Sequence, residues 1–284
     1  MPTRAMVFEP ALADLSRSDR PLFGPVSFRD YVEGHDLEAT PRTPRYISVD
    51  ALADLAPELR EAGVMVLRAG SALEGTGTAF VLVEGDDGAD EFFLRDEVTF
   101  ADLPVERFSS PVDDDQLVSF RSLPRLSETS LVNLALASGL LADALELDTT
   151  GALPPPATGR STFTFPFRPH SALEEPITHR NGQVEIDTLF VDRRESKRTL
   201  FVLEAKTGDR ASLAKHKLVY PVLALAASVP PDVEIVPVYL RCRQRGERVI
   251  FDVAECTLED PRESLPGIDD LAVCRSKVLE MGLE

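Results

Sequence analysis

The chain has 284 residues, of which 43% are hydrophobic, so it can bury the core of one large domain or of two ordinary ones. It has no apolar run of about 18 residues, which argues against a membrane-spanning helix, and its N-terminus lacks the features of a signal peptide. Three scattered cysteines suit neither a zinc cluster nor a disulfide framework. We therefore expect a cytoplasmic protein with no membrane partner.

The formal net charge of −18 disfavours a broad nucleic-acid-binding surface, because phosphate contacts require Lys and Arg. The charge is uneven along the chain. Residues 1–118 hold 24 acids and 10 bases, a balance of −14, and residues 119–284 hold 24 acids and 20 bases, a balance of −4. Residues 180–217 hold nine bases against six acids, and four of the five lysines lie there. Net charge therefore lowers the odds of nucleic-acid binding without excluding it.

The first part of the chain predicts an α+β domain. Asp50 is a candidate N-cap for a helix over 50–61 that carries Leu52, Leu55 and Leu59 on one face. Three strands are expected after it, over 64–67, 78–83 and 91–94. The polar stretch 109–116 resembles a linker, which places a domain boundary near 118. Residues 1–118 are then a candidate target-recognition or dimerisation domain.

Residues 119–284 predict a second domain that mixes helices and strands. Ser127 is a candidate N-cap for a helix over 127–147. The later elements expected are strands at 161–167, 183–191 and 199–206, a helix at 211–228 interrupted by Pro221, and strands at 234–242 and 248–256.

The stretch GQVEIDTLFVDRRESKRTLFVLEAKTGD, residues 182–209, places ionisable residues inside two apolar strand-like runs. Strand alternation sends Glu204 and Lys206 to one face. If the strands form a hairpin, Asp187 can lie beside Glu204. Adjacent carboxylates raise each other's pKa unless a cation lies between them, and such oxygen ligands suit Mg²⁺. Lys206 could then hold or activate a water. The alternative is a surface hairpin with an ordinary salt bridge.

These residues resemble the motif of the PD-(D/E)XK nuclease superfamily, which includes type II restriction endonucleases, junction resolvases and repair nucleases. Asp187, sixteen residues, and then Glu204-Ala205-Lys206 match its acidic residue and acidic-x-Lys positions. The resemblance implies a restriction-endonuclease-like core, with a mixed central sheet flanked by helices, in residues 119–284. It also implies that Asp187, Glu204 and the Ala205 carbonyl hold Mg²⁺, with Mn²⁺ as a substitute, and that Lys206 lies at the water.

In that superfamily a glutamate of the first helix often joins the site, and Glu128 holds the matching place here. Alone, Glu128 is also explained as a first-turn acid favoured by the helix dipole. The helix after the motif lysine commonly carries a Gln, whereas this chain has His216, Lys217 and Tyr220 in that neighbourhood.

The sequence thus predicts a Mg²⁺-dependent DNA endonuclease, similar to type II restriction enzymes, acting on double-stranded DNA as a homodimer. The residues expected to contact DNA are Arg193, Arg194, Lys215, His216 and Lys217. Arginines 241, 243 and 245 are further candidates, although such a pattern more often marks a solvated edge strand. The alternatives are a repair or branched-DNA nuclease of the same superfamily, and a non-catalytic DNA-binding or regulatory protein on that scaffold.

Overall fold

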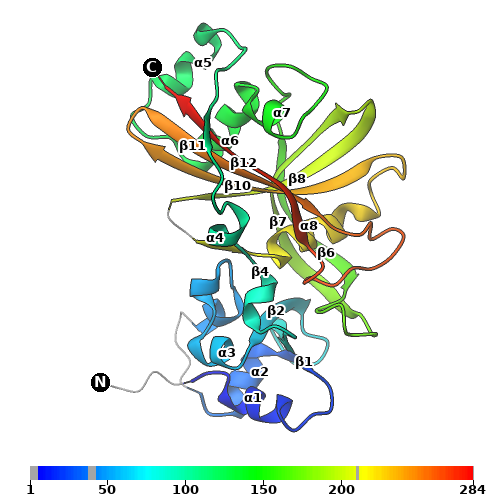
Figure 1. Ribbon diagram of the computed structural model, residues 1–284. Coiled ribbons are helices and arrows are strands. Elements are labelled where there is room, and N and C mark those ends of the chain that lie inside the picture. Colours follow the sequence, from blue (N-terminus) through cyan, green and yellow to red (C-terminus); the bar gives the residue numbers. More distant parts are fainter. Residues whose placement is uncertain (1–5, 38–42, 209–210, 284) are drawn as a thin grey trace.

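The computed structural model describes residues 6–37, 43–208 and 211–283, which form a mixed α+β fold built on one large twisted sheet (Figure 1). The elements before residue 103 are α1 Glu9–Leu15, β1 Leu22–Ser27, α2 Phe28–Gly34, η1 Thr43–Ile47, η2 Leu52–Asp54, α3 Pro57–Glu61, β2 Val64–Ser71, β3 Thr78–Glu84, η3 Ala89–Phe92, β4 Phe93–Arg95 and α4 Asp96–Thr99. Those that follow are β5 Val105–Arg107, α5 Asp114–Arg121, α6 Glu128–Ala137, α7 Leu140–Ala144, β6 Ala157–Phe167, β7 Ile177–Arg194, β8 Lys197–Thr207, β9 Ser212–Ala214, α8 His216–Ala226, β10 Glu234–Arg245, β11 Arg248–Thr257 and β12 Ala272–Gly282.

The centre of the sheet is formed by four neighbouring strands in the order β6, β7, β8 and β10. β6, β7 and β8 pair antiparallel, whereas β8 and β10 are parallel and are joined by a crossover through α8. A parallel pair needs such a crossover because its strands run in the same direction. The sheet continues through β11 and β12 to β5. The predicted succession of one helix, three strands, one helix and one strand is present, with β9 and α7 as additions.

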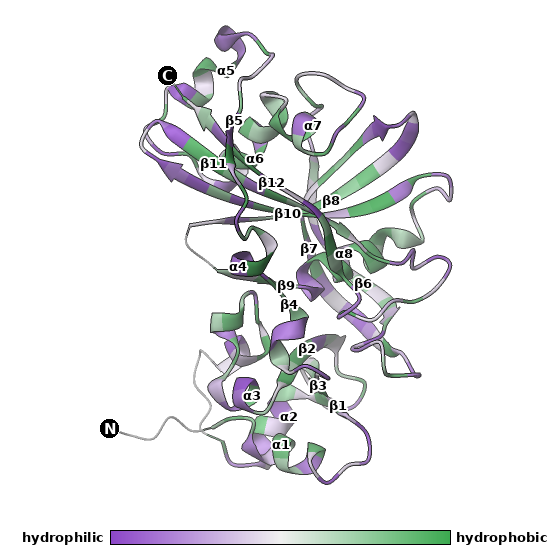
Figure 2. Cartoon of the chain, in the orientation of Figure 1, coloured by the Kyte–Doolittle hydropathy of each residue, from purple (hydrophilic) through white to green (hydrophobic). Residues whose placement is uncertain are grey.

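Helices cover both faces of these strands, and β8 shows why. Phe201, Leu203 and Ala205 lie in one buried cluster with residues of α6 and α7. Leu200 and Val202 belong to a different cluster with a residue of α8. The alternation of side chains along a strand therefore buries β8 on both sides, and Figure 2 shows the hydrophobic residues concentrated along these middle strands. Glu204 lies in a strand that is otherwise a core element.

The sheet of the first region, β1, β3 and β2, meets the large sheet where β2 approaches β7. The register pairs Gly70 with Arg180. A Cβ on Gly70 would lie 2.2 Å from the Arg180 carbonyl oxygen, and Gly70 has a φ of +78°. Only glycine therefore permits this approach. A second junction pairs β4 with β9, just before α8. The first region is consequently fixed beside the end of β8 and the start of α8.

Several predicted boundaries need correction. The helix expected over 50–61 is two short helices, η2 and α3, because Pro57 starts a new helix instead of continuing one. The helix expected over 127–147 breaks at Gly139, which has a left-handed φ of +79°. The predicted Ser127 cap is present, since its side chain accepts the Ser130 N–H. Helix α8 begins at His216, because the preceding residues pair with β4.

The strands expected over 64–67 and 78–83 are confirmed as β2 and β3, and those of the second region as β6, β7, β8, β10 and β11. The expected linker over 109–116 contains the start of α5. β5, which also precedes residue 118, pairs with β12. The domain boundary near 118 stays a prediction. No helix in the described parts of the chain is long and apolar enough to cross a membrane.

Candidate active site

The hairpin of β7 and β8 brings the two predicted carboxylates together. The strands pair antiparallel as far as Thr188 with Leu203, so Asp187 and Glu204 are the next facing pair. The Asp187 carboxylate then takes the place of a strand carbonyl and accepts the Ala205 N–H, with 3.4 Å between Oδ2 and N. The polar side chains therefore lie where the ladder between β7 and β8 ends.

Glu204 is a buried carboxylate, 3% exposed, between two lysines. Its Oε1 lies 2.7 Å from Lys206 Nζ and 3.7 Å from Lys217 Nζ. Burial raises the pKa of Glu204 to about 7, against the attraction of both ammonium groups and with a contribution from the Asp187 charge. Two lysines thus compensate the charged form of Glu204 only in part near neutral pH.

Lys217 and Asp50 complete the cluster from elements outside the hairpin. Lys217 lies in the first turn of α8, with Nζ 3.4 Å from Asp50 Oδ1. Burial opposes the charge on both groups. The neighbouring carboxylates Glu204 and Asp50 nevertheless raise the pKa of Lys217, and the two lysines lower the pKa of Asp50. Asp50 was expected to cap a helix. The junction of β4 with β9 instead brings it beside Lys217, and no local sequence pattern could predict this position.

Glu128, the candidate from the first helix, lies at the end of β8 but outside the lysine cluster. It occupies the first turn of α6, as predicted, and its Oε2 accepts a hydrogen bond of 3.1 Å from the Thr207 hydroxyl. Thr207 and Lys206 are consecutive residues of β8, so their side chains point to opposite faces. Glu128 therefore approaches the motif from the α6 side of the sheet.

Two of the residues expected to contact DNA turn inward at the start of α8. Lys215 Nζ lies 2.6 Å from the carbonyl oxygen of Asp269 and is partly buried. Burial lowers the pKa of His216 to about 3, with a further decrease from the adjacent Lys217, so the imidazole is neutral at pH 7. Of the three basic residues at 215–217, the structure brings Lys217 to the carboxylates and turns Lys215 towards a loop.

Arg193 and Arg194 lie at the opposite end of the hairpin from the carboxylates. Arg193 Nη1 donates to the Ser196 carbonyl over 2.9 Å, and Arg194 Nη1 lies 2.6 Å from Glu255 Oε1. Both arginines precede β8, which begins at Lys197. Glu204 comes seven residues after Lys197, roughly 20 Å further along the strand. The structure therefore does not bring these arginines into the candidate site.

Strand β10, which was expected to be a solvated edge strand, lies between β8 and β11. Arg241 and Arg243 are held by the fully buried Asp252, at 2.6 Å and 2.8 Å. Arg241 also pairs with Asp96, which is 6% exposed. Arg241 and Arg243 are thus neutralised inside the fold, which corrects the prediction for these two residues, whereas Arg245 is exposed.

Comparison with known proteins identifies a family. Residues 103–270 match the family described as "Domain of unknown function (DUF6997)". That range is more than half of the chain. The chain belongs to this family. No curated protein and no solved structure matches it. The DUF6997 segment contains Glu128, Asp187, Glu204, Lys206 and Lys217, whereas Asp50 lies outside it.

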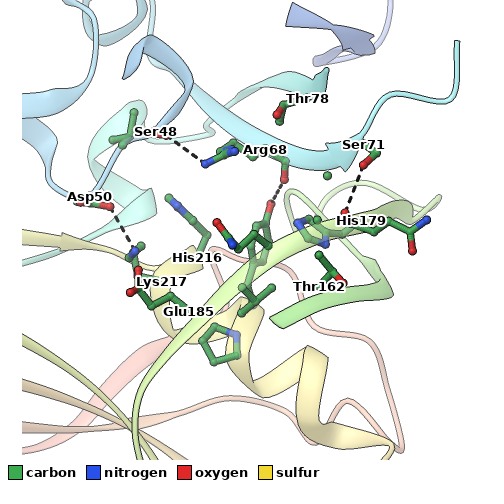
Figure 3. A pocket seen from close by; sticks show the side chains of 18 residues that line it. Ser48, Asp50, Arg68, Ser71, Thr78, Thr162, His179, Glu185, His216 and Lys217 are labelled. Carbon is green, nitrogen blue, oxygen red and sulfur yellow. Dashed lines mark hydrogen bonds and ion pairs between the residues drawn. The ribbon is translucent and has the colours of Figure 1, made fainter. Parts of the chain in front are cut away.

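Two pockets meet at β7 beside the carboxylates of the DUF6997 segment. One, of about 300 Å³, is lined by Glu128, Asp187 and Ala205. The other, of about 350 Å³, is lined by Lys217 and by residues of the first region (Figure 3). Glu185 lines both pockets. One pocket is therefore lined by Asp187 itself, and the other by Lys217, which contacts Glu204.

The oxygen donors of the DUF6997 segment fit a hard divalent cation. Asp187 and Glu204 supply two carboxylates, and the Ala205 carbonyl directly follows Glu204 in the chain. The raised pKa of Glu204 indicates an incompletely compensated charge, which a cation would stabilise. Within the described residues, no three His, Cys, Asp or Glu side chains are placed so that they could together hold one metal ion. Two protein carboxylates are sufficient for Mg²⁺, because this ion usually keeps several of its water ligands.

Proposed function

We propose that this protein is a Mg²⁺-dependent DNA endonuclease that hydrolyses phosphodiester bonds at specific sequences, in the manner of type II restriction enzymes. The observation that carries the proposal is the buried Glu204, which lies beside Asp187 and within reach of Lys206 and Lys217. The proposed setting is the cytoplasm, and the proposed assembly is a homodimer, because a two-fold protein suits a palindromic site.

The topology supports the proposal. The strands β6, β7, β8 and β10 lie in that order between α6 and α8, and β8 is parallel to β10. This is the arrangement implied by the resemblance to the PD-(D/E)XK superfamily, with the acidic residue on the second strand and the acidic-x-Lys on the third. The motif residues lie on the strands that the resemblance requires, at the point where these strands separate.

Asp187, Glu204 and the Ala205 carbonyl would hold the metal ion. When bound, Mg²⁺ or Mn²⁺ supplies positive charge that polarises the phosphate and stabilises the leaving oxygen. Glu204 must be ionised to bind a metal, so its pKa of about 7 predicts that metal affinity falls as the pH decreases through neutrality.

Two lysines of the chain have separate roles. Lys206 hydrogen-bonds to Glu204 on the same strand, so its ammonium is held at the carboxylate pair, where it can orient the attacking water and offset charge developing on the phosphate. Lys217 spans the distance between Glu204 and Asp50. It therefore fixes the first region against the site and adds positive charge on the substrate side.

Digestion of plasmid DNA tests the proposal. We expect discrete fragments with Mg²⁺ or Mn²⁺, no cleavage in excess chelator, and binding without turnover in Ca²⁺. Asp187→Asn should abolish cleavage. Asp192→Asn is a matched control on the same strand, because Asp192 accepts a hydrogen bond from Thr149 and lies outside the site.

The alternatives give different results in the same assay. Cleavage confined to branched DNA would replace the restriction-like proposal by a resolvase-like activity. Metal-dependent binding that never leads to cleavage would identify a DNA-binding protein. Cleavage that persists in chelator, or that Asp187→Asn does not affect, would overturn the proposed site.

A further inference from the structure

The pocket of about 350 Å³ beside the candidate active site is built by both regions of the chain (Figure 3). β2 supplies Arg68 and Ser71, β7 supplies His179 and residues 181–185, and α8 supplies His216, Lys217 and Tyr220. Lys217 also contacts Glu204. Glu185 is two residues from Asp187, about 7 Å along a strand. A ligand in this pocket would therefore adjoin a phosphate held at the carboxylates.

Arg68 gives the pocket a cation that is available to a ligand. Its side chain is exposed on β2, donates to the Ser48 hydroxyl over 3.3 Å, and forms no ion pair within the parts of the chain that the structure describes. Its backbone is nevertheless fixed, because the Arg68 carbonyl accepts a 2.8 Å hydrogen bond from the buried Tyr220 hydroxyl. A fixed arginine without a carboxylate partner is suited to a phosphate.

Helix α8 and strand β7 contribute rings to the lining of the pocket. His216 lies at the pocket wall, partly buried, with its ring centroid 5.4 Å from that of Tyr220. Tyr220 in turn packs against His179 at 5.2 Å, and His179 stacks on Phe165 at 4.6 Å. Burial lowers the pKa of both histidines, so their rings are neutral at pH 7. Neutral aromatic rings are surfaces on which nucleobases stack.

Other polar side chains of the pocket match the edge of a base. The pocket is also lined by the side chains of Thr162, Asn181 and Gln183. Their hydroxyl and amide groups both donate and accept hydrogen bonds, as base edges do. The pocket thus combines a phosphate-binding cation, a ring surface and hydrogen-bonding groups, which are the three components of nucleotide recognition.

We infer that this pocket binds one unstacked nucleotide of the substrate strand, with its phosphate on Arg68 and its base against His216. The inference rests on the proposed nuclease function and extends it. It makes the first region part of the substrate site and predicts a preference for DNA in which the nucleotide next to the cleaved bond is single-stranded or extruded. Extrusion from a duplex costs a few kcal/mol, which single-stranded or mismatched DNA avoids.

Binding of small probes tests the pocket without any cleavage. Deoxyadenosine 5′-monophosphate, deoxyadenosine and inorganic phosphate would be titrated into the 284-residue protein by calorimetry or NMR. Arg68→Gln should weaken binding of the nucleotide ~10-fold or more, the scale of one charged hydrogen bond, and leave the nucleoside unaffected. His216→Ala should weaken binding of the nucleotide and the nucleoside ~5-fold or more and spare phosphate, because it removes stacking.

The control is Arg60→Gln, which removes an exposed arginine of α3 outside the pocket. Arg68→Lys should retain part of the nucleotide affinity, since the charge remains. The inference is overturned if the wild-type protein does not bind the nucleotide, or if Arg68→Gln and Arg60→Gln weaken binding equally. Arg68 is an exposed side chain, so Arg68→Gln is expected to fold even if His216→Ala does not.

A cleavage assay separates this inference from the proposed function. If wild-type protein cleaves DNA and Arg68→Gln has an unchanged KM for single-stranded and duplex substrates, the pocket assignment fails while the nuclease stands. If Arg68-dependent nucleotide binding is found without any cleavage, the pocket stands and the nuclease fails. A substrate with an extruded nucleotide should be cleaved with a lower KM than the fully paired duplex, and Arg68→Gln should reduce that advantage.

Discussion

Two clusters of buried charge lie on neighbouring strands of this protein and differ in how their charges are balanced. The parallel register of β8 and β10 pairs Glu204 with Tyr239 and Lys206 with Arg241. On β10, Arg241 and Arg243 balance Asp96 and Asp252, and the Tyr239 hydroxyl contacts Asp96 over 3.1 Å. The two positive and two negative groups compensate each other inside the fold.

The cluster on β8 is not balanced in the same way. It contains three carboxylates, those of Asp50, Asp187 and Glu204, and two lysines, Lys206 and Lys217. It also adjoins two pockets, whereas Asp252 is completely buried. An ion-pair network whose positive and negative charges are equal in number holds strands together. A network with an excess of carboxylates next to a pocket can bind a cation. The comparison separates a structural network from a candidate site, although both arise from similar residues.

The largest expected effect belongs to the balanced network. Asp252→Ala leaves Arg243 without its buried partner and Arg241 with Asp96 alone, so it should lower the free energy of unfolding by ~3–5 kcal/mol. Asp187→Ala should cost less than about 1 kcal/mol, because Asp187 is partly exposed and repels Glu204. Urea unfolding of both variants measures the difference. Equal losses would mean that the β8 cluster is a structural network as well.

The second prediction uses the pH dependence of Glu204. The pKa of this carboxyl is raised from 4.5 to about 7, so the folded state binds a proton that the unfolded state releases between these values. Wild-type protein in chelator should therefore lose stability relative to Glu204→Gln as the pH rises from 5 to 8. The change approaches about 3 kcal/mol, from 1.36 kcal/mol per pKa unit.

Urea unfolding at several pH values checks this difference, and Mg²⁺ should reduce it at pH 8 by binding the ionised carboxylate. A difference between the two proteins that is independent of pH would show that Lys206 and Lys217 compensate the charge of Glu204 fully.

The third prediction concerns Lys206, the residue that distinguishes catalysis from binding. Lys206→Ala should bind DNA nearly as well as wild type in Ca²⁺ while cleaving at least ~100-fold more slowly, the scale for losing one preorganised charge. Single-turnover cleavage and equilibrium binding measure the two effects separately. A near-normal rate would leave Lys206 with only the role that Arg241 has on the neighbouring strand.

The smallest expected effect separates two lysines at the start of α8. Lys217→Ala should weaken binding of all DNA sequences ~10-fold and flatten the salt dependence by about one unit, because Lys217 lies on the substrate side of the site. Lys215→Ala should leave the salt dependence unchanged, since Lys215 is directed to the Asp269 carbonyl. An unchanged salt slope in Lys217→Ala would place the DNA-binding surface elsewhere.

The sequence by itself determined which segments form the hairpin strands and which of their side chains share a face. Apolar runs on both sides of one polar turn specify β7 and β8, and the alternation within each run places Glu204 and Lys206 on one face. The pairing of Asp187 with Glu204 follows from the length of that turn. These are local properties, and a hairpin expresses them without help from distant residues.

Only the tertiary structure decided which charges join the site. Lys215 and Lys217 have the same local context, yet one faces a loop and the other Glu204, because the helix turns between them. Asp50 and Arg68 reach the site because β4 pairs with β9, and because Gly70 permits the close contact of β2 with β7. The arginines of β10 resemble a basic patch in sequence, and the pairing of Arg241 and Arg243 with the buried Asp96 and Asp252 makes these two structural. Charge compensation depends on neighbours in space, and for these residues the neighbours come from distant parts of the chain.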